Sequence, residues 1–245
     1  MRLFIWFPLF VIIEHIVLTQ QIRMNIIYGI MDKKGIQIYN KDAEKGISIT
    51  IGNAKVNTLG KPINIHFEKQ PSFVYLVLDC SGSMAGEKLS QAKKGIEDFA
   101  KDAFKKEYSV GLIGFDSQAK HICEPTFDIS ALKNGLEKLF ATGTTNMADA
   151  ITLAHHHLKK HEGTRAIVIA TDGQPDNPAY ALTSGEIAKK DNIDIITIGT
   201  DDADQVFLKT LASRTDLGNK VSREEFSYTI SSSVKLLPTP KSIKK

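Results

Sequence analysis

The stretch LVLDCSGSMAG, residues 76–86, decides how the rest of the chain is interpreted. It starts as an apolar run, typical of a strand buried on both faces, and continues with Asp79, Ser81 and Ser83 at alternate positions. Glycines lie between and after the serines, where they permit a tight backbone path. A strand that returned directly to solvent needs no oxygen atom at every second position, so the stretch is interpreted as a site.

After Pro71 the chain alternates between strand-like and helix-like segments. FVYLVLD and RAIVIATD are continuous apolar runs, as expected of strands that are covered on both faces. In the segment 89–103, apolar residues recur at intervals of three and four, which predicts a helix that packs on a sheet. This alternation predicts an α/β fold, with a doubly wound, mostly parallel sheet flanked by helices.

Four further expectations concern individual elements of this domain. SVGLIGFD and AKHICEP are predicted to form a hairpin around Ser117. A short strand is predicted near residues 220–222, followed by a helix over residues 224–237. Cys80 alternates away from the oxygen-bearing residues, so its side chain is predicted to pack in the core.

The chain before Pro71 has a different character. Residues 24–70 contain short isoleucine-rich stretches separated by Gly, Asn and Asp, which predict a small β-rich extension. Pro71 and Ser72 mark the boundary to the α/β domain, predicted over residues 72–238. The prolines and lysines of residues 239–245 predict a basic tail without further packed structure.

Residues 1–23 form an apolar segment that resembles the apolar region of a signal peptide but has no small-residue cleavage site. Its uninterrupted part, residues 3–13, is shorter than the roughly 20 residues that a bilayer requires, and it contains Pro8. Two interpretations stay open. Either Met24 is the true initiator, or residues 1–23 are an uncleaved membrane anchor or export segment.

The composition is that of an ordinary globular protein, with 42% hydrophobic residues and a net charge of +3 over 245 residues. Three lysines of the tail account for that charge, and no basic stripe is interleaved with aromatic residues, which argues against nucleic acid as a partner. The two cysteines, Cys80 and Cys123, predict reduced thiols rather than a disulfide framework. A cytoplasmic location is therefore predicted, and membrane attachment depends on residues 1–23.

Two later segments are expected to end at the same rim as Asp79. GTTNMADA places Thr145 just before a helix, and ATDGQPDN places Asp172 at the end of a central strand. Ligands of such sheets bind at the carboxyl ends of the strands. Hydroxyls and carboxylates suit a hard cation, above all Mg²⁺, with Mn²⁺ or Ca²⁺ as alternatives.

Three motifs in this order resemble the von Willebrand factor type A family, which includes the integrin I domains: D-x-S-x-S, G-x-T-N and T-D-G. The resemblance spans residues 72–237 and implies the same doubly wound fold. It also implies a complete metal-ion-dependent adhesion site (MIDAS). The residues that it implies as direct ligands are Ser81, Ser83 and Thr145, and those implied to hold metal-bound waters or to ligate the ion are Asp79 and Asp172.

The resemblance implies a protein-interaction module of the adhesion type and not an enzyme. Neutral hydroxyl ligands leave the ion's charge only partly compensated, and in the family a Glu or Asp of another protein completes the coordination. The alternative is a Mg²⁺-dependent phosphohydrolase with Asp79 as nucleophile. Against this alternative, Ser81 stands where a second acid would serve general acid–base catalysis.

Four histidines, at positions 155–157 and 161, invite a second metal interpretation. Successive helical residues point about 100° apart, so three histidines in a row cannot converge on one ion. His157 and His161 are four apart, but the sequence offers no evident third ligand. These histidines are therefore predicted to lie on the surface.

Overall fold

The structure is a computed structural model that describes residues 67–240 without a gap, and the side chains of residues 70–240. It also describes six strands outside that range, at residues 28–32, 35–39, 47–51, 54–58, 63–65 and 242–244. The chain divides into two compact units, one of residues 1–69 with 242–245 and one of residues 70–241. The apolar segment predicted at residues 1–23 lies outside the described residues.

The first unit contains antiparallel strands, as predicted for the extension. β1 (Tyr28–Asp32), β2 (Gly35–Tyr39) and β5 (Ile63–Ile65) form one sheet, and β3 (Ile47–Ile51) pairs with β4 (Ala54–Thr58). β6 (Phe67–Lys69) pairs with β13 (Ser242–Lys244), so a short strand forms within the tail that was predicted to lack further packed structure. Strand pairing is made by main-chain hydrogen bonds, which do not require apolar side chains.

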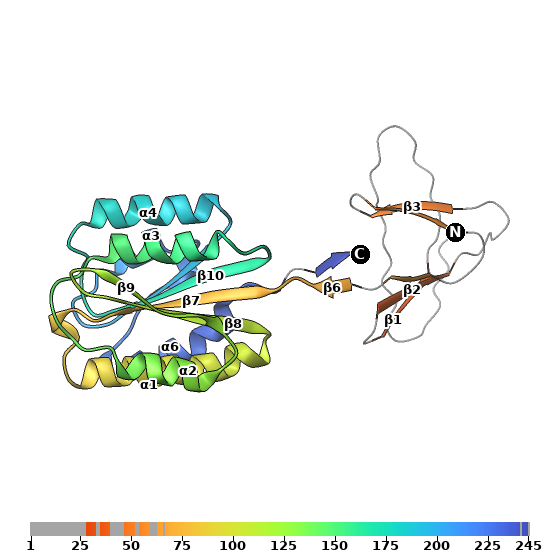
Figure 1. Cartoon of the computed structure of the whole chain (residues 1–245). Coiled ribbons are helices and arrows are strands. Elements are labelled where there is room, and N and C mark those ends of the chain that lie inside the picture. Colours follow the sequence, from red (N-terminus) through yellow and green to blue (C-terminus); the bar gives the residue numbers. More distant parts are fainter. Residues whose placement is uncertain are drawn as a thin grey trace. The chain divides into compact units, whose positions relative to one another are not determined.

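The second unit is built on a six-stranded sheet in the order β12-β11-β10-β7-β8-β9 (Figure 1). Neighbouring strands are parallel except β8 and β9, which form the predicted hairpin. The strands are β7 (Ser72–Asp79), β8 (Tyr108–Phe115), β9 (Ala119–Thr126), β10 (Thr164–Thr171), β11 (Asp194–Gly199) and β12 (Gly218–Lys220). The predicted α/β fold is confirmed, and the last strand lies two residues earlier than predicted.

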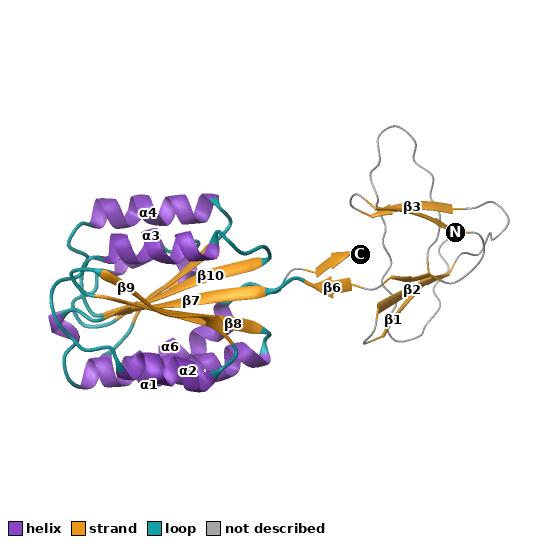
Figure 2. Ribbon diagram, in the orientation of Figure 1, coloured by secondary structure: helices purple, strands orange, loops and turns teal. Residues whose placement is uncertain are grey.

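Helices cover both faces of this sheet (Figure 2). One face is packed against α1 (Glu87–Lys105), α2 (Ile129–Glu137) and α6 (Arg223–Ser232). The other is packed against α3 (Met147–Leu158), α4 (Pro178–Lys190) and α5 (Gln205–Leu211). Short 3₁₀ turns are η1 (Gly82–Met84), η2 (Thr215–Leu217) and η3 (Ser233–Leu236). Within the described residues, no helix has both the length and the apolar character needed to cross a bilayer.

Strand β7 illustrates why the apolar runs are continuous rather than alternating. Val74, Leu76 and Leu78 pack into the core on the α1 face. Tyr75 and Val77 pack into the core on the α3 face. Every residue of the strand's centre is therefore buried, which is the pattern expected of a parallel strand with helices on both sides.

The helix predicted over residues 224–237 is shorter in the structure: α6 ends at Ser232, and η3 follows. The hydroxyls of Ser231, Ser232 and Ser233 each donate to the carbonyl three residues earlier. Such local bonds compete with the α-helical ladder and favour the tighter 3₁₀ turn. The serine run explains the difference from the predicted helix.

Gly111 in β8 allows the ring of Tyr75 to lie across the strand, since a Cβ at this position would lie 2.4 Å from Tyr75 Cε1. We expect Gly111→Ala to lower the free energy of unfolding by about 1–3 kcal/mol, because the buried ring has to move. Urea denaturation measures the loss. Gly173→Ala is the matched control, since a Cβ there meets nothing within 4 Å. Equal losses in the two variants would contradict the assignment.

Candidate metal centre

The carboxyl ends of β7 and β10 bring two aspartates to one edge of the sheet. The two strands are parallel neighbours, and Ala170 pairs with Leu78 in their register. Asp79 is the last residue of β7, and Asp172 follows directly on β10. Because neighbouring parallel strands end at the same edge, the two carboxylates lie at a common rim, where both are buried.

A series of hydrogen bonds joins these two carboxylates through the loop after β7. The backbone N–H of Ser81 donates to Asp79 Oδ1 at 2.8 Å. The hydroxyl oxygens of Ser81 and Ser83 are 3.0 Å apart, and the Ser83 hydroxyl donates to Asp172 Oδ1 at 2.8 Å. Four of the five residues predicted to hold the ion therefore lie in one hydrogen-bonded series.

Thr145, the fifth predicted residue, lies in a loop that is bonded to the loop after β7. The N–H of Gly82 donates to the Gly143 carbonyl at 3.1 Å, and the N–H of Thr142 donates to the Cys80 carbonyl at 2.8 Å. Thr145 is itself buried. Its hydroxyl nevertheless lies outside the hydrogen bonds that link the other four among the described side chains.

Asp79 is fully buried, with 0% of its surface exposed. Its Oδ2 accepts a hydrogen bond from the Thr171 hydroxyl at 2.5 Å, and its Oδ1 accepts from Ser81. Burial raises the pKa of Asp79 to about 6, although the bonds from Thr171 and Ser81 lower it, and the charge of Asp172 raises it further. A cation at the rim would favour the charged form of this buried carboxyl group.

Lys88, near the start of α1, places a positive charge beside the carboxylate of Asp172. Its ammonium group forms an ion pair with Asp172 and another, at 3.1 Å, with Asp201. Arg223 also pairs with Asp201, at 2.7 Å. Burial lowers the pKa of Lys88, but its hydrogen bonds to the two aspartates outweigh burial and raise the pKa above its ordinary value. A metal ion bound at Asp172 would therefore lie close to the positive charge of Lys88.

The donor set of this rim fits a hard divalent cation. Hydroxyl and carboxylate oxygens are the ligands that Mg²⁺ takes in proteins, where it usually retains several waters. The side chains of the hydrogen-bonded series carry only oxygen atoms, and none of them offers the nitrogen or sulfur ligands that zinc favours. Cys80, the nearest thiol in sequence, is buried in the core on the α1 face, as predicted.

Two residues of the rim escaped the sequence analysis. Thr171 immediately precedes Asp172 in the T-D-G motif, and that place in the motif, at the end of the same strand, was the signal that could have identified it. Lys88 lies nine residues after Asp79, with no motif to connect it to Asp172. Only the packing of α1 beside the rim brings its ammonium group to that carboxylate.

The fold and the rim together define an α/β domain with a candidate cation site of oxygen ligands at the carboxyl edge of its sheet. The sequence profile of the von Willebrand factor type A domain matches residues 74–238, which is more than half of the chain. The chain therefore belongs to the von Willebrand factor type A family. The resemblance stated from the three motifs is confirmed for the family.

Curated relatives match the same part of the chain. This chain is 29% identical over 153 residues to the magnesium-chelatase 67 kDa subunit of Chlorobaculum parvum. The match covers 60% of this chain and 24% of that protein. This chain is also 29% identical over 160 residues to a UPF0353 protein of Mycobacterium avium. That match covers 57% of this chain and 48% of that protein. The chain thus spans less than half the length of these relatives.

Two solved structures have a similar fold. The von Willebrand factor domain of a type V pili tip protein from Porphyromonas gingivalis has a TM-score of 0.63 and 13% identity, over 69% of this chain and 95% of that one. Proximal thread matrix protein 1 from the mussel byssus, solved with a zinc-occupied MIDAS motif, has a TM-score of 0.60 and 18% identity. The match covers 72% of this chain and 49% of that one. At these identities the likeness shows the fold.

Thr171→Val keeps the shape of the side chain and removes the hydroxyl that donates to Asp79. We expect a loss of about 1–3 kcal/mol in the free energy of unfolding, because a buried acceptor loses its partner. Urea denaturation without added metal measures this loss. Thr152→Val is the matched control, since the Thr152 hydroxyl is exposed, and its expected change is within about 0.5 kcal/mol. A loss at Thr171 no larger than the control's would refute the role assigned to its hydroxyl.

Proposed function

We propose that this domain binds a divalent cation at the rim, Mg²⁺ by preference, and through it a carboxylate of a protein partner. The observation that carries the proposal is the hydrogen-bonded series from Asp79 to Asp172. The residues proposed as direct ligands are Ser81, Ser83 and Thr145, and those proposed to hold metal-bound waters or to ligate the ion are Asp79 and Asp172.

The chemistry of these residues explains why binding would need an acidic partner. The hydroxyls of Ser81 and Ser83 are neutral, and the charge of Asp172 is shared with Lys88. A bound ion would supply positive charge that such ligands compensate only in part. A Glu or Asp side chain of another protein is then a favourable further ligand, and the loops around the rim supply specificity.

Two comparisons support this proposal. The pili tip protein and the mussel byssus protein carry the same fold, and the second is described with an ion in the corresponding motif. That ion is zinc, so the choice of Mg²⁺ here rests on the oxygen donors of the rim. Mn²⁺ and Ca²⁺ are the alternatives, and Zn²⁺ belongs among the ions to be measured.

The competing phosphohydrolase is disfavoured by the environment of Asp79. Both oxygens of this carboxylate already accept hydrogen bonds, and none of its surface is exposed to a phosphate ester. A nucleophile has to reach the reacting atom. We therefore propose binding without turnover, and Mg²⁺-dependent phosphatase activity that Asp79→Asn abolishes would overturn this proposal.

The cytoplasmic location stays a prediction. Cys80 and Cys123 are both free, as predicted, and Cys80 is buried. Free thiols favour a reducing compartment. The absence of nucleic acid among the partners likewise stays a prediction from the charge pattern.

Saturating Mg²⁺ should raise the melting temperature, because a ligand that binds only the folded state stabilises it, by about 2.7 kcal/mol at one hundred times the Kd. Ser81→Ala combined with Ser83→Ala should remove the increment, since it deletes both hydroxyls of the series. Ser90→Ala, an exposed serine of α1, is the matched control. A melting temperature that is insensitive to Mg²⁺ in the unmodified chain would count against the site.

Lys88→Met should tighten Mg²⁺ binding at least about fivefold, because about 1 kcal/mol of repulsion between the ammonium group and the ion is removed. Isothermal titration calorimetry measures the affinity. Lys101→Met, which removes an exposed positive charge elsewhere on α1, is the matched control. Unchanged or weaker binding in Lys88→Met would show that Lys88 does not compete with the ion at Asp172.

The partner proposal is tested by affinity capture with the immobilised full chain. Proteins that bind through the rim should be retained in Mg²⁺, released by EDTA, and absent from the chain that carries Ser81→Ala and Ser83→Ala. In a retained partner, replacing the responsible Glu or Asp by its amide should abolish retention. Retention that persists in EDTA would contradict metal-dependent binding.

A further inference from the structure

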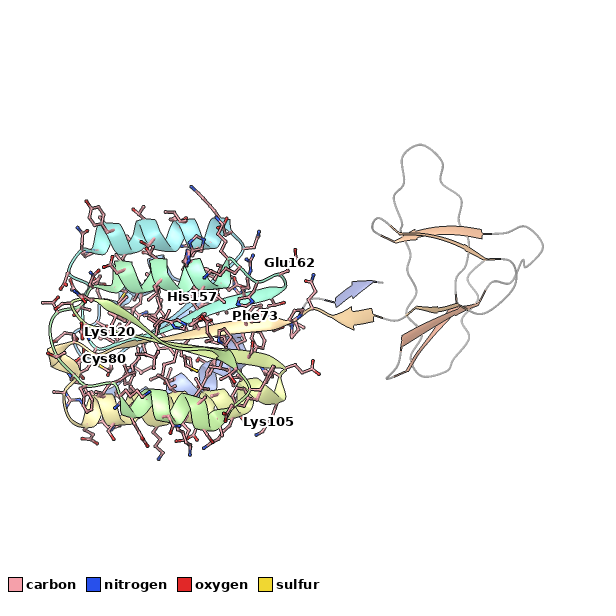
Figure 3. All side chains as sticks on the ribbon, in the orientation of Figure 1. Phe73, Cys80, Lys105, Lys120, His157 and Glu162 are labelled. Carbon is pink, nitrogen blue, oxygen red and sulfur yellow. The ribbon has the colours of Figure 1, made fainter. Side chains whose placement is uncertain are left out.

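A second group of potential ligands lies away from the rim, between strand β9 and helix α3. It consists of His121 and Glu124 from β9 and His157 from α3. The rim lies at the N-terminal end of α3, and His157 lies about 15 Å along the helix axis from the first helical residue. Figure 3 shows His157 on the side of α3 that faces the sheet.

An irregularity of β9 places His121 and Glu124 on the same side of the sheet. Residues three apart on a regular strand face opposite sides. Here the consecutive residues Leu112 and Ile113 of β8 pair with Cys123 and His121, so β9 carries an extra residue. Residues 122 and 123 both pack against the core on the α1 face, which leaves His121 and Glu124 on the α3 face.

Tyr75 holds these two side chains in place from inside the core. Its hydroxyl lies 2.9 Å from His121 Nε2 and donates to Glu124 Oε2 at 2.9 Å. Burial raises the pKa of Tyr75 far above its ordinary value, so the phenol stays a proton donor. Tyr75 is thus a positioning residue of the kind that orients ligands at metal sites.

His157 completes the group from the helix. Its Nδ1 lies 3.1 Å from Glu124 Oε1, and its ring stacks on that of His121 with centroids 4.1 Å apart. Only 15% of the His157 side chain is exposed, so the prediction that it is a surface histidine is wrong, whereas the adjacent His156 is exposed as predicted. Burial, with the nearby His121 and Lys160, lowers the pKa of His157 and favours its neutral form, although Glu124 opposes this shift.

Glu124 is the charged member of the group. Burial raises its pKa, but the hydrogen bond from Tyr75 and the electrostatic interactions with His121, His157 and Lys160 outweigh burial and lower the pKa below its ordinary value. By its residue types, the group offers one carboxylate and two imidazole rings as ligands. Neutral imidazole and ionised carboxylate are the forms that bind a metal ion.

We propose that His121, Glu124 and His157 form a binding site for a transition-metal ion, zinc by its donor set. Their ligand atoms lie within 4.8 Å of one another. A tetrahedral zinc ion places its ligands about 3.3 Å apart and lies in the plane of each imidazole ring, so the site closes by side-chain shifts of about 1 Å together with rotation of the two stacked rings. Glu124, with 64% of its side chain exposed, has solvent on one side that leaves room for such a shift.

The ion would connect the edge strand β9 to helix α3 and leave its fourth position to water, on the side where Glu124 is exposed. Two histidines with a glutamate are a known ligand set for zinc with an open position. The oxygen atoms of the rim have the opposite preference, for hard cations. This inference is therefore independent of the function proposed for the rim.

The test uses the full chain carrying Ser81→Ala and Ser83→Ala, so that the rim hydroxyls do not contribute. Co²⁺ serves as a spectroscopic probe and Zn²⁺ as its competitor. We expect one equivalent of Co²⁺ to give the visible absorption of a four- or five-coordinate nitrogen and oxygen site. Zn²⁺ should displace it and raise the melting temperature. Absence of both effects would overturn the proposal and leave a hydrogen-bond cluster only.

Two further substitutions in the same background assign the ligands. His157→Ala and Glu124→Gln should each weaken Co²⁺ binding by about 10–100-fold or more. Loss of a residue that only hydrogen-bonds to a metal ligand already weakens metal binding by about that factor. His156→Ala is the matched control, and its affinity should equal that of the background. Melting in EDTA establishes that each variant is folded, and Glu124→Gln, at an exposed residue, keeps the test valid if His157→Ala unfolds. Equal binding by all three variants would refute the site.

Discussion

The parallel pairing of β7 with β10 is the constraint on which the rest of the rim depends. It places Asp79 and Asp172 at one edge of the sheet, where both carboxylates are buried. Two buried carboxylates near one another are costly unless donors or cations compensate them. The hydroxyls of Ser83 and Thr171 and the ammonium group of Lys88 supply that compensation in the structure. Each of these groups is placed by a different element that converges on the same edge.

The two ligand groups of this domain differ in chemistry because different elements build them. At the rim, loops that follow parallel strands present hydroxyls and carboxylates, and oxygen atoms suit hard cations. Between β9 and α3, an irregular edge strand and a helix present two imidazoles beside a carboxylate, which suits zinc. Gly111 links this second group to the core, since its lack of a side chain leaves room for the Tyr75 ring that reaches His121 and Glu124.

Much of the fold was predictable from the sequence, because buried strands and amphipathic helices each have a periodicity of their own. The continuous apolar run of β7 and the spacing of apolar residues in α1 are two such signals, and both elements formed where they were predicted. The end of α6 was not predicted, since the serine hydroxyls that bond to its last carbonyls act locally and leave no periodic signal. The tail strand β13 was missed because main-chain pairing has no side-chain pattern.

By itself the sequence determined that Asp79, Ser81, Ser83 and Asp172 lie near one edge, because they follow apolar strands in a parallel α/β pattern. Only the tertiary structure decided which groups meet there and elsewhere. Lys88 contacts Asp172 through the packing of α1, and His157 meets two residues of β9 that lie more than 30 positions earlier in the chain. The physical reason is that periodicity specifies which face of an element is buried, whereas contacts between polar side chains depend on register, irregularities of the strand and the placement of helices.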